Sequence, residues 1–296
     1  MPKEINLEEL KKKKTVRELL EFGIINIDKP SGPTSFQVSE FVKEKLKARK
    51  TSHFGTLDPK VSGVLPIAIN RACRLTEYFI HHDKEYVGVM KLHKEMKLED
   101  IQKTINQKFI GKIVQKPPVR SRVARVERQR EIKKFELIEQ DGMDILFHVE
   151  CEGGTYIRKL IHDLGNELKI GSHMLELRRV RAGIFKETDE KYPSINLYEF
   201  EKAVKECEKG REESLKRMII PAEIVSKLYP SLQVKECYVK RVLHGSPIYE
   251  KYIKPIKKEI NGLVCAFAKE KFIGIYEIVN ERGIIAKPKF VLQPID

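Results

Sequence analysis

Two short apolar runs, 22–28 and 64–69, constrain the fold of this chain more than any other stretch. The first run is stopped by the sequence Pro-Ser-Gly-Pro at 30–33. Because proline and glycine favour tight turns, both runs are predicted to be buried strands with abrupt ends. Between them, Thr34 and Gln37 fit a capping box, which predicts the start of a helix. Strand, stiff turn, helix and strand in close succession indicate a domain that mixes α and β structure.

A glycine-bounded loop at 51–63 separates that helix from the second apolar run. Its one acid, Asp58, stands before Pro59, and lysines and arginines flank it on both sides. Asp-Pro is often only a turn or a helix start, because Asp caps helices and Pro suits the first helical position. The second interpretation is that Asp58 is an ionised group held close to a polyanion. The local sequence favours the turn, so the rest of the chain has to decide.

The chain of 296 residues is strongly basic, with 57 Lys+Arg against 43 Asp+Glu and a net charge of +14. Such an excess points to nucleic acid as a partner, with an anionic membrane surface second. The apolar runs are too short to span a bilayer, and the first residues lack the apolar core of a signal peptide, so a cytoplasmic protein is expected. The five cysteines are scattered, which disfavours a zinc site and a disulfide framework.

Composition divides the chain into a tail and two domains. Residues 1–22 are charged, with four lysines at 11–14, and are expected to form a solvated tail or an arm that touches nucleic acid. Short strand-like runs with Gly and Pro turns fill the last part of the chain and suggest a small β-barrel. The expected boundaries give a basic tail at 1–22, a main domain at 23–226 and a barrel at 227–296.

Two further segments carry unusual charge. The arginine-rich stretch 114–134 is interpreted as an exposed basic loop or hairpin. Thr155 is placed to cap a helix with an apolar stripe, which Gly165 is predicted to end. Arg158 falls in the first turn of that helix, where the helix dipole disfavours a cation. A nearby acid or phosphate would compensate for it.

Six motifs, taken in chain order, resemble those of one enzyme family. The motifs are 26–35 (Asn-Ile-Asp-Lys-Pro-Ser-Gly-Pro-Thr-Ser), 53–66 (His-Phe-Gly-Thr-Leu-Asp-Pro-Lys-Val-Ser-Gly-Val-Leu-Pro), 84–86 (Lys-Glu-Tyr), 117–118 (Pro-Pro) with Ser121, 154–158 (Gly-Thr-Tyr-Ile-Arg) and 177–179 (Leu-Arg-Arg). They are similar to those of the TruB/dyskerin family of RNA pseudouridine synthases, specifically its archaeal H/ACA-type members, and the C-terminal residues resemble the PUA domain of that family. The family usually has glycine where this chain has Ser52 and a small residue where it has Phe54.

The resemblance implies a fold and a reaction. The fold is α+β, with a catalytic domain built on a mixed, mostly antiparallel sheet with flanking helices, and a small C-terminal β-barrel of the PUA type. The reaction is the isomerisation of uridine to pseudouridine in RNA, in which the base is detached, turned and reattached through carbon without metal or cofactor. The implied substrates are the T-loop uridine of transfer RNA, ribosomal RNA sites chosen by a guide RNA, or both. Small H/ACA ribonucleoprotein proteins are the implied partners.

The same resemblance assigns roles to residues. Asp58 is expected to be the nucleophile, or the carboxylate that promotes glycosidic cleavage, since a carboxylate is anionic at neutral pH and can form a covalent bond. Arg158 would pair with Asp58 and fix its orientation, and Tyr86 would stack on the flipped uracil. The remaining expectations are substrate contacts at Tyr156, His53 and Leu177, support of the loop by Lys29 and Pro30, and RNA contacts at Arg120, Arg122, Arg125, Arg128, Arg130 and Gly245.

Most of these residues also have an ordinary structural interpretation. Tyr86 fits a cross-strand pair, Arg158 an exposed surface arginine, and Tyr156 and Leu177 fit core packing. For the whole chain, the alternative is a non-catalytic RNA-binding or assembly protein of the same fold. A glycoside hydrolase is disfavoured, because it needs two carboxylates beside the scissile bond and no second acid accompanies Asp58.

Overall fold

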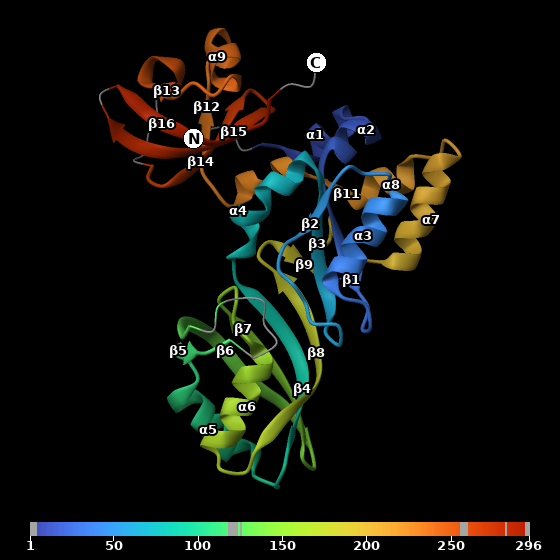
Figure 1. Ribbon diagram of the computed structural model, residues 1–296, viewed down its shortest axis with the longest axis vertical. Coiled ribbons are helices and arrows are strands. Elements are labelled where there is room, and N and C mark those ends of the chain that lie inside the picture. Colours follow the sequence, from blue (N-terminus) through green and yellow to red (C-terminus); the bar gives the residue numbers. More distant parts are fainter. Residues whose placement is uncertain (1–4, 118–123, 125, 255–259, 282, 294–296) are drawn as a thin grey trace. The chain divides into compact units, whose positions relative to one another are not determined.

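The structure is a computed structural model that describes residues 5–117, 124, 126–254, 260–281 and 283–293. The chain forms two compact units (Figure 1). Unit 1 comprises residues 1–24, 68–75 and 219–296, and unit 2 comprises residues 25–67 and 76–218. The boundaries expected after residues 22 and 226 stay a prediction.

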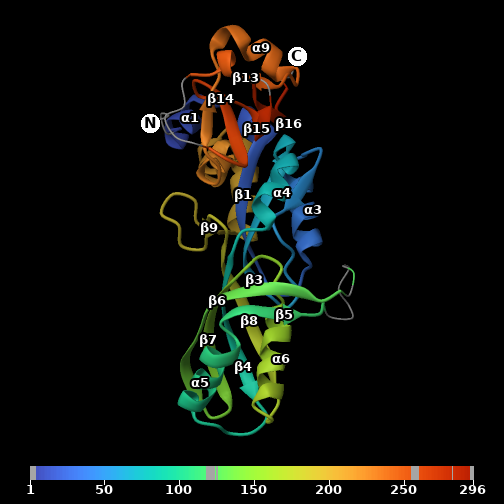
Figure 2. The same ribbon diagram turned by 90° about the vertical axis from the view of Figure 1, so that its left-hand side faces the viewer.

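A large mixed sheet organises unit 2, and several of its long strands can be followed side by side in Figure 2. Its strands are β1 (Phe22–Lys29), β2 (Thr51–His53), β3 (Ser62–Asn70), β4 (Lys84–Leu92), β5 (Gly111–Gln115), β6 (Arg128–Asp141), β7 (Asp144–Cys151), β8 (Ser172–Ala182), β9 (Phe185–Lys186) and β10 (Ile195–Asn196). The order along the sheet is β10-β1-β3-β8-β4-β7-β6-β5, with β2 on β3 and β9 on β8. The β1–β10 and β3–β8 pairs are parallel, whereas the β8–β4, β4–β7, β7–β6 and β6–β5 pairs are antiparallel. The expected mixed, mostly antiparallel sheet is confirmed.

Burial along the strands explains their sequences. Strand β3 is buried at seven consecutive positions, which agrees with its apolar run between two neighbouring strands. Strand β4 alternates between buried and half-buried positions, as expected for a strand with one face on the core. The segment around Tyr86 is therefore a half-buried strand that displays every second side chain on one face.

Six α helices accompany the strands in the described part of unit 2. The first begins as expected, because Thr34 Oγ1 accepts a hydrogen bond from Gln37 N at 3.1 Å and Gln37 Oε1 accepts one from Thr34 N at 2.8 Å. Among the described residues, no helix combines the length and the apolar character needed to cross a bilayer. The helices are α3 (Ser35–Lys45), α4 (Thr76–Ile80), α5 (Leu98–Lys108), α6 (Ile157–Glu167), α7 (Leu197–Glu208) and α8 (Glu213–Met218).

Both predicted ends of helix α6 were wrong. Tyr156, not Thr155, is the N-cap residue, and the Thr155 hydroxyl donates instead to the carbonyl of Glu152 at 2.7 Å. Gly165 lies inside the helix, which continues to Glu167. A Cβ at Gly165 would come within 2.1 Å of the backbone nitrogen of Ser172, so glycine is required there for the close approach of β8 rather than for a C-cap.

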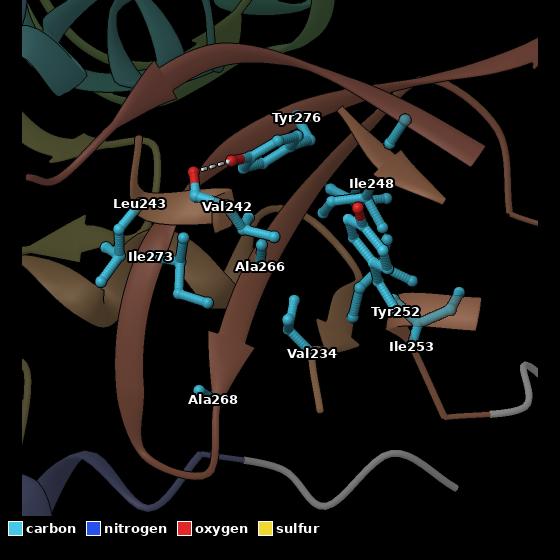
Figure 3. Packing of buried hydrophobic residues seen from close by; sticks show 13 residues of the cluster. Val234, Val242, Leu243, Ile248, Tyr252, Ile253, Ala266, Ala268, Ile273 and Tyr276 are labelled. Carbon is cyan, nitrogen blue, oxygen red and sulfur yellow. Dashed lines mark hydrogen bonds between the residues drawn. The ribbon is translucent and has the colours of Figure 1, made fainter. Parts of the chain in front are cut away.

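The C-terminal part of unit 1 is a second, five-stranded sheet with an apolar core. The core cluster includes Val242, Ile248 and Ile273, and the Tyr276 hydroxyl donates to the Val242 carbonyl at 3.0 Å (Figure 3). The strand order is β12-β14-β15-β16-β13, which confirms the small C-terminal β module. Its elements are β12 (Ser231–Gln233), α9 (Val239–Leu243), β13 (Ile248–Tyr249), β14 (Leu263–Ala268), β15 (Lys271–Glu281) and β16 (Ile284–Val291). The preceding strand, β11 (Ile219–Pro221), pairs with β1 in the large sheet instead.

Residues 7–21 are not the solvated tail that their charge suggested. They form two short helices, α1 (Leu7–Lys13) and α2 (Val16–Glu21), which bury Leu7, Leu10 and Leu19. Lys14 pairs with Glu223, whose side chain is only 4% exposed. The lysine run therefore lies on an element that packs within unit 1 through leucines placed three residues apart.

Candidate active site

The loop that carries Asp58 lies between β2 and β3 and is held from within by Lys29. Lys29 is fully buried, and its ammonium group donates to the carbonyls of Pro30 at 2.8 Å, Pro59 at 3.0 Å and Val61 at 2.8 Å. Burial lowers the pKa of Lys29, while the negative charge of Asp58 acts in the opposite direction. Lys29 thus joins the stiff turn after β1 to the backbone on both sides of Asp58.

The start of helix α3 holds the same loop from a second side. The Ser35 hydroxyl donates to the Leu57 carbonyl at 2.9 Å and accepts from the Leu57 amide at 2.8 Å. The amide of Gly32 donates to the carbonyl of Pro59 at 2.9 Å. Because the residues on both sides of Asp58 are fixed by buried groups, its carboxylate is presented by a rigid turn.

Both departures from the family pattern are accommodated by local packing. Phe54 is buried, and its ring stacks on that of Phe79 with centroids 4.6 Å apart and an interplanar angle of 7°. The Thr76 hydroxyl donates to the Ser52 hydroxyl at 3.0 Å. These contacts join the loop to helix α4.

Asp58 meets Arg158, which lies in the first turn of helix α6. Arg158 Nη2 donates to Asp58 Oδ2 at 2.7 Å, across a separation of 100 residues in the chain. The two side chains are 55% and 56% exposed, so the ion pair is open to a large substrate. The acid also accounts for a cation at the N-terminus of a helix, where the dipole alone would disfavour it.

Tyr86 lies in β4 and faces a buried arginine, Arg179, to which the sequence assigned no role. In the sheet register Tyr86 pairs with Val149 of β7 and with Arg179 of β8. Burial raises the pKa of the Tyr86 hydroxyl, although the facing Arg179 guanidinium acts in the opposite direction. Burial likewise lowers the pKa of Arg179. The tyrosine is 8% exposed and neutral at physiological pH.

Arg179 joins three strands at this point. Its side chain is 1% exposed, Nε donates to the Val64 carbonyl of β3 at 2.8 Å, and Nη2 donates to the Gly55 carbonyl of the Asp58 loop at 3.0 Å. The motif at 177–179 contains Arg179 but assigns it no role, and no sequence signal separates it from the neighbouring Arg178. Its backbone passes so close to Gly63 that a Cβ there would lie 2.2 Å from the Arg179 carbonyl oxygen.

The other expected substrate contacts are placed as follows. Leu177 lies opposite Gly88 in the β4–β8 register and shares a face of β8 with Arg179. His53 Nε2 lies 3.0 Å from Thr56 Oγ1. Burial lowers the pKa of His53, and the positive charge of Arg179 acts in the same direction, so the imidazole is neutral at pH 7.

Tyr156 is held by its backbone. Its amide donates to Gln115 Oε1 at 3.0 Å, and its carbonyl accepts from Gln115 Nε2 at 3.2 Å. These two hydrogen bonds join strand β5 to the N-terminus of helix α6. The basic hairpin and Arg158 are therefore parts of one local structure.

Three of the expected RNA contacts, Arg120, Arg122 and Arg125, lie outside the described residues. Arg128 is exposed at the start of β6, which forms the expected hairpin with β5. Arg130 is half-buried, and its Nη2 would lie 3.1 Å from a Cβ placed on Gly154.

Gly245 follows helix α9 with φ +87° and borders a pocket of about 810 Å³. No atom of the described residues lies within 4 Å of the position of its missing Cβ, so the backbone is accessible there. The rings of Tyr238 and Tyr252 stack beside the pocket at a centroid distance of 4.1 Å. The pocket is lined by Cys237, Lys240, Arg241, His244, Gly245, Ser246, Tyr249, Lys251 and Tyr252.

Comparison with known proteins decides the family. A model of the N-terminal domain of the TruB family pseudouridylate synthases matches residues 43–157, and a model of the C-terminal domain of tRNA pseudouridylate synthase B matches residues 158–226. The chain belongs to the TruB family of pseudouridylate synthases. The resemblance seen in the motifs is confirmed, and the protein is an RNA pseudouridine synthase, which isomerises uridine to pseudouridine.

Similar curated proteins come from archaea. The chain is 42% identical over 293 residues to the probable tRNA pseudouridine synthase B of Thermococcus kodakarensis, which covers 96% of this TruB-family chain and 84% of the relative. It is 41% identical over 247 residues to the protein of that name from Methanocaldococcus jannaschii, with 83% and 72% covered.

Solved structures agree. A chain in the crystal structure of a Cbf5-Nop10-Gar1 complex superposes with a TM-score of 0.85 at 36% identity, covering 96% of this chain and 89% of that one. A chain in the structure of an H/ACA RNP bound to a substrate RNA containing 2′-deoxyuridine gives 0.84 at 34% identity, with the same coverage.

Proposed function

We propose that Asp58 is the reactive carboxylate of this pseudouridine synthase and that Arg158 orients it. The single observation that carries this assignment is the 2.7 Å contact between Arg158 Nη2 and Asp58 Oδ2. It brings together two motifs that lie 100 residues apart in the chain. A rigid loop, a half-exposed acid and a guanidinium on one of its oxygens leave the second oxygen available for bond formation.

The neighbouring side chains form the pocket for the base in this proposal. Tyr86 offers a ring face to the flipped uracil, and Leu177 lies on the adjacent strand as an apolar wall. Neutral His53 holds the nucleotide by a hydrogen bond, and Tyr156 closes the pocket. Lys29 and Pro30 keep the loop in place without touching the RNA.

The proposed substrates follow from the relatives. The curated archaeal relatives are named probable tRNA pseudouridine synthase B, and two similar solved structures are a Cbf5-Nop10-Gar1 complex and an H/ACA RNP with bound substrate RNA. We infer that this chain acts on transfer RNA, on ribosomal RNA sites chosen by a guide RNA, or on both, with small H/ACA proteins as partners. The net charge of +14 supports a polyanionic substrate. Cytoplasmic location stays a prediction.

RNA binding is assigned to two surfaces. The basic hairpin with Arg128 and Arg130 would contact the backbone near the active site. The C-terminal module, which we assign to the PUA type, would hold RNA in the pocket beside Gly245. Cations and tyrosine rings line that pocket, and the two groups bind phosphates and bases respectively.

The decisive experiment measures pseudouridine formation under single-turnover conditions, with and without guide RNA and partner proteins. Asp58→Asn is expected to lower the rate by about 10³-fold or more while RNA affinity is retained. Asp163→Asn is the matched control, because it removes a half-buried acid from helix α6, where it pairs with Lys159. Undiminished activity of Asp58→Asn would contradict the assignment. Activity on transfer RNA without guide or partners would establish stand-alone action.

A further inference from the structure

Every charged side chain that is buried in the described part of unit 2 is a cation. These are Lys29, Lys84 and Arg179, with exposed fractions of 0%, 4% and 1%. We call them the buried cation cluster. Removing an ion from water is costly unless it is paired, so buried charges normally come with a partner of opposite sign.

Backbone carbonyls, not carboxylates, bind all three cations. Lys29 and Arg179 donate to the loop and to β3 as described above. Lys84 Nζ donates to the Ile80 carbonyl at 3.0 Å and to the His82 carbonyl. Carbonyl dipoles satisfy the hydrogen-bond donors, but they leave the net charge in place.

The cluster lies under the loop that presents Asp58. A Cβ placed on Gly55 would lie 3.3 Å from Arg179 Nη1 and 3.6 Å from Lys84 Cε. Lys29 lies at the other end of the loop, under Pro59. The three positive charges therefore surround the backbone of the catalytic motif.

The groups that face Lys84 from β7 and β8 do not neutralise it. Burial raises the pKa of the Cys151 thiol in β7 to about 12, so it carries no charge. In β8, Arg179 is itself a cation, and Arg181 is balanced by Glu85 at 2.5 Å and Glu150 at 2.7 Å.

The acid next to Lys84 in the chain is also engaged elsewhere. Asp83 pairs with Lys133 of strand β6. Tyr86, two residues further along β4, is neutral because burial raises its pKa. The cluster thus keeps a surplus of positive charge beside Tyr86, on which the base is proposed to stack.

We propose that the buried cation cluster stabilises the negative charge that develops on uracil when its glycosidic bond breaks. In that step the C1′–N1 bond breaks, its electron pair stays on the base and spreads onto O2 and O4, and C1′ bonds to an Asp58 oxygen. Afterwards C5 bonds to C1′, the Asp58 carboxylate leaves, C5 loses its proton and N1 gains one. The three cations do not touch the base but are positioning residues, whose fixed field in a dry environment favours the anion. This inference rests on the proposed role of Asp58.

The charge of the cluster depends on pH. Burial lowers the pKa of Lys84 to about 8, with the facing Arg179 acting in the same direction. Below that value Lys84 is an ammonium ion, and above it the cluster loses one of its positive charges. The rate of bond cleavage is therefore expected to fall as the pH rises through mildly alkaline values. RNA affinity should stay constant over this range, because it depends on exposed cations.

The test measures the single-turnover rate of the full protein, with the RNA and partners on which it proves active, between pH 6.5 and 9. For the wild type we expect a fall of about tenfold centred near pH 8, since one charge of the cluster is lost. Lys84→Met is expected to be about tenfold slower at pH 7 and to lack this fall. Lys91→Met, an exposed lysine of the same strand, should follow the wild-type profile, including any alkaline change of the RNA itself.

The following outcomes decide the matter. A wild-type rate that stays constant across pH 8 overturns the proposal, and this measurement does not depend on whether any variant folds. A Lys84→Met profile that matches the wild-type profile overturns it as well. Lys84→Arg, which keeps its charge at every pH used, should restore the rate without the alkaline fall. If Asp58→Asn is inactive and Lys84 has no effect, only this inference fails. If Asp58→Asn is active, the proposed function fails first.

Discussion

The C-terminal sheet of unit 1 and the loop region of unit 2 differ in how their buried polar and charged groups are compensated. In unit 1 the core shown in Figure 3 is apolar, and its Tyr276 hydroxyl is satisfied by a carbonyl. Glu223, the most deeply buried charge described in that unit, is paired with Lys14. Beneath Asp58, three cations are buried, and no carboxylate in the described part of unit 2 is buried with them. An arrangement that lowers stability and recurs three times around one loop indicates a region built for reactivity.

The comparison also separates two kinds of glycine. Gly63 has φ +103°, and a Cβ there would meet the Arg179 backbone, whereas Gly111 has φ +83° and open space around it. The first is required by packing around the cluster, and the second only by its own backbone conformation.

The largest effect is therefore expected for Gly63→Ala. Backbone strain and a 2.2 Å contact with the Arg179 carbonyl together should lower the free energy of unfolding by about 4 kcal/mol. Gly111→Ala, with strain alone, should lose about 1 kcal/mol. Urea titration followed by circular dichroism measures both. Equal losses would show that the loop does not depend on its contact with β8.

A smaller effect, with a distinctive pH dependence, is expected for Lys84. Its pKa is about 8 in the folded protein and near 10.5 when the chain is unfolded, so the unfolded chain binds more protons between these values. The wild type should therefore gain stability relative to Lys84→Met as pH rises from 8 to 10.5, by up to about 3 kcal/mol. Unfolding titrations at pH 7 and pH 10 measure this difference.

Lys91→Met provides the comparison, because Lys91 is 39% exposed and pairs with Asp144 at 3.2 Å. It should show little change relative to the wild type over the same pH range. A constant difference between the wild type and Lys84→Met would mean that Lys84 is neutralised by a group of opposite charge. If the free energy of unfolding of the wild type rises with pH while its catalytic rate falls, the Lys84 ammonium group lowers stability but increases the rate.

The sequence predicted the site better where a motif has a chemical signature. The helix start at Arg158 called for a nearby acid or phosphate, the family resemblance named Asp58 as its partner, and the two side chains do pair. Arg179 was missed because an arginine in a basic strand gives no sign of facing inward. Its burial depends on the β3–β8 and β4–β8 registers, which are tertiary properties.

The fold shows the same division. The capping box at Thr34 and the apolar run at 64–69 are local signals, and both were interpreted correctly. Gly165 lies inside helix α6 because Ser172 at the start of β8 packs closely against it. Such a tertiary contact cannot be predicted from the local sequence. The four lysines at 11–14 likewise led to the prediction of a tail, although the spacing of Leu7 and Leu10 fits a helix with one buried face.

The smallest change in stability is expected at the ion pair that carries the chemistry. Arg158 and Asp58 are each more than half exposed, so Arg158→Gln should change the free energy of unfolding by less than about 0.5 kcal/mol. The rate of pseudouridine formation should nevertheless fall by about 10²-fold, because the carboxylate loses its orientation.

Arg181→Gln is the reciprocal control, since Arg181 is 15% exposed and binds two carboxylates. It should cost about 2 kcal/mol or more, because Glu85 and Glu150 would lose their partner. Thermal unfolding and single-turnover rates on both variants would separate the two arginines. A stable but slow Arg158→Gln beside a destabilised Arg181→Gln would distinguish the exposed, reactive ion pair from the more buried, structural one. Two variants with equal stability would contradict that distinction.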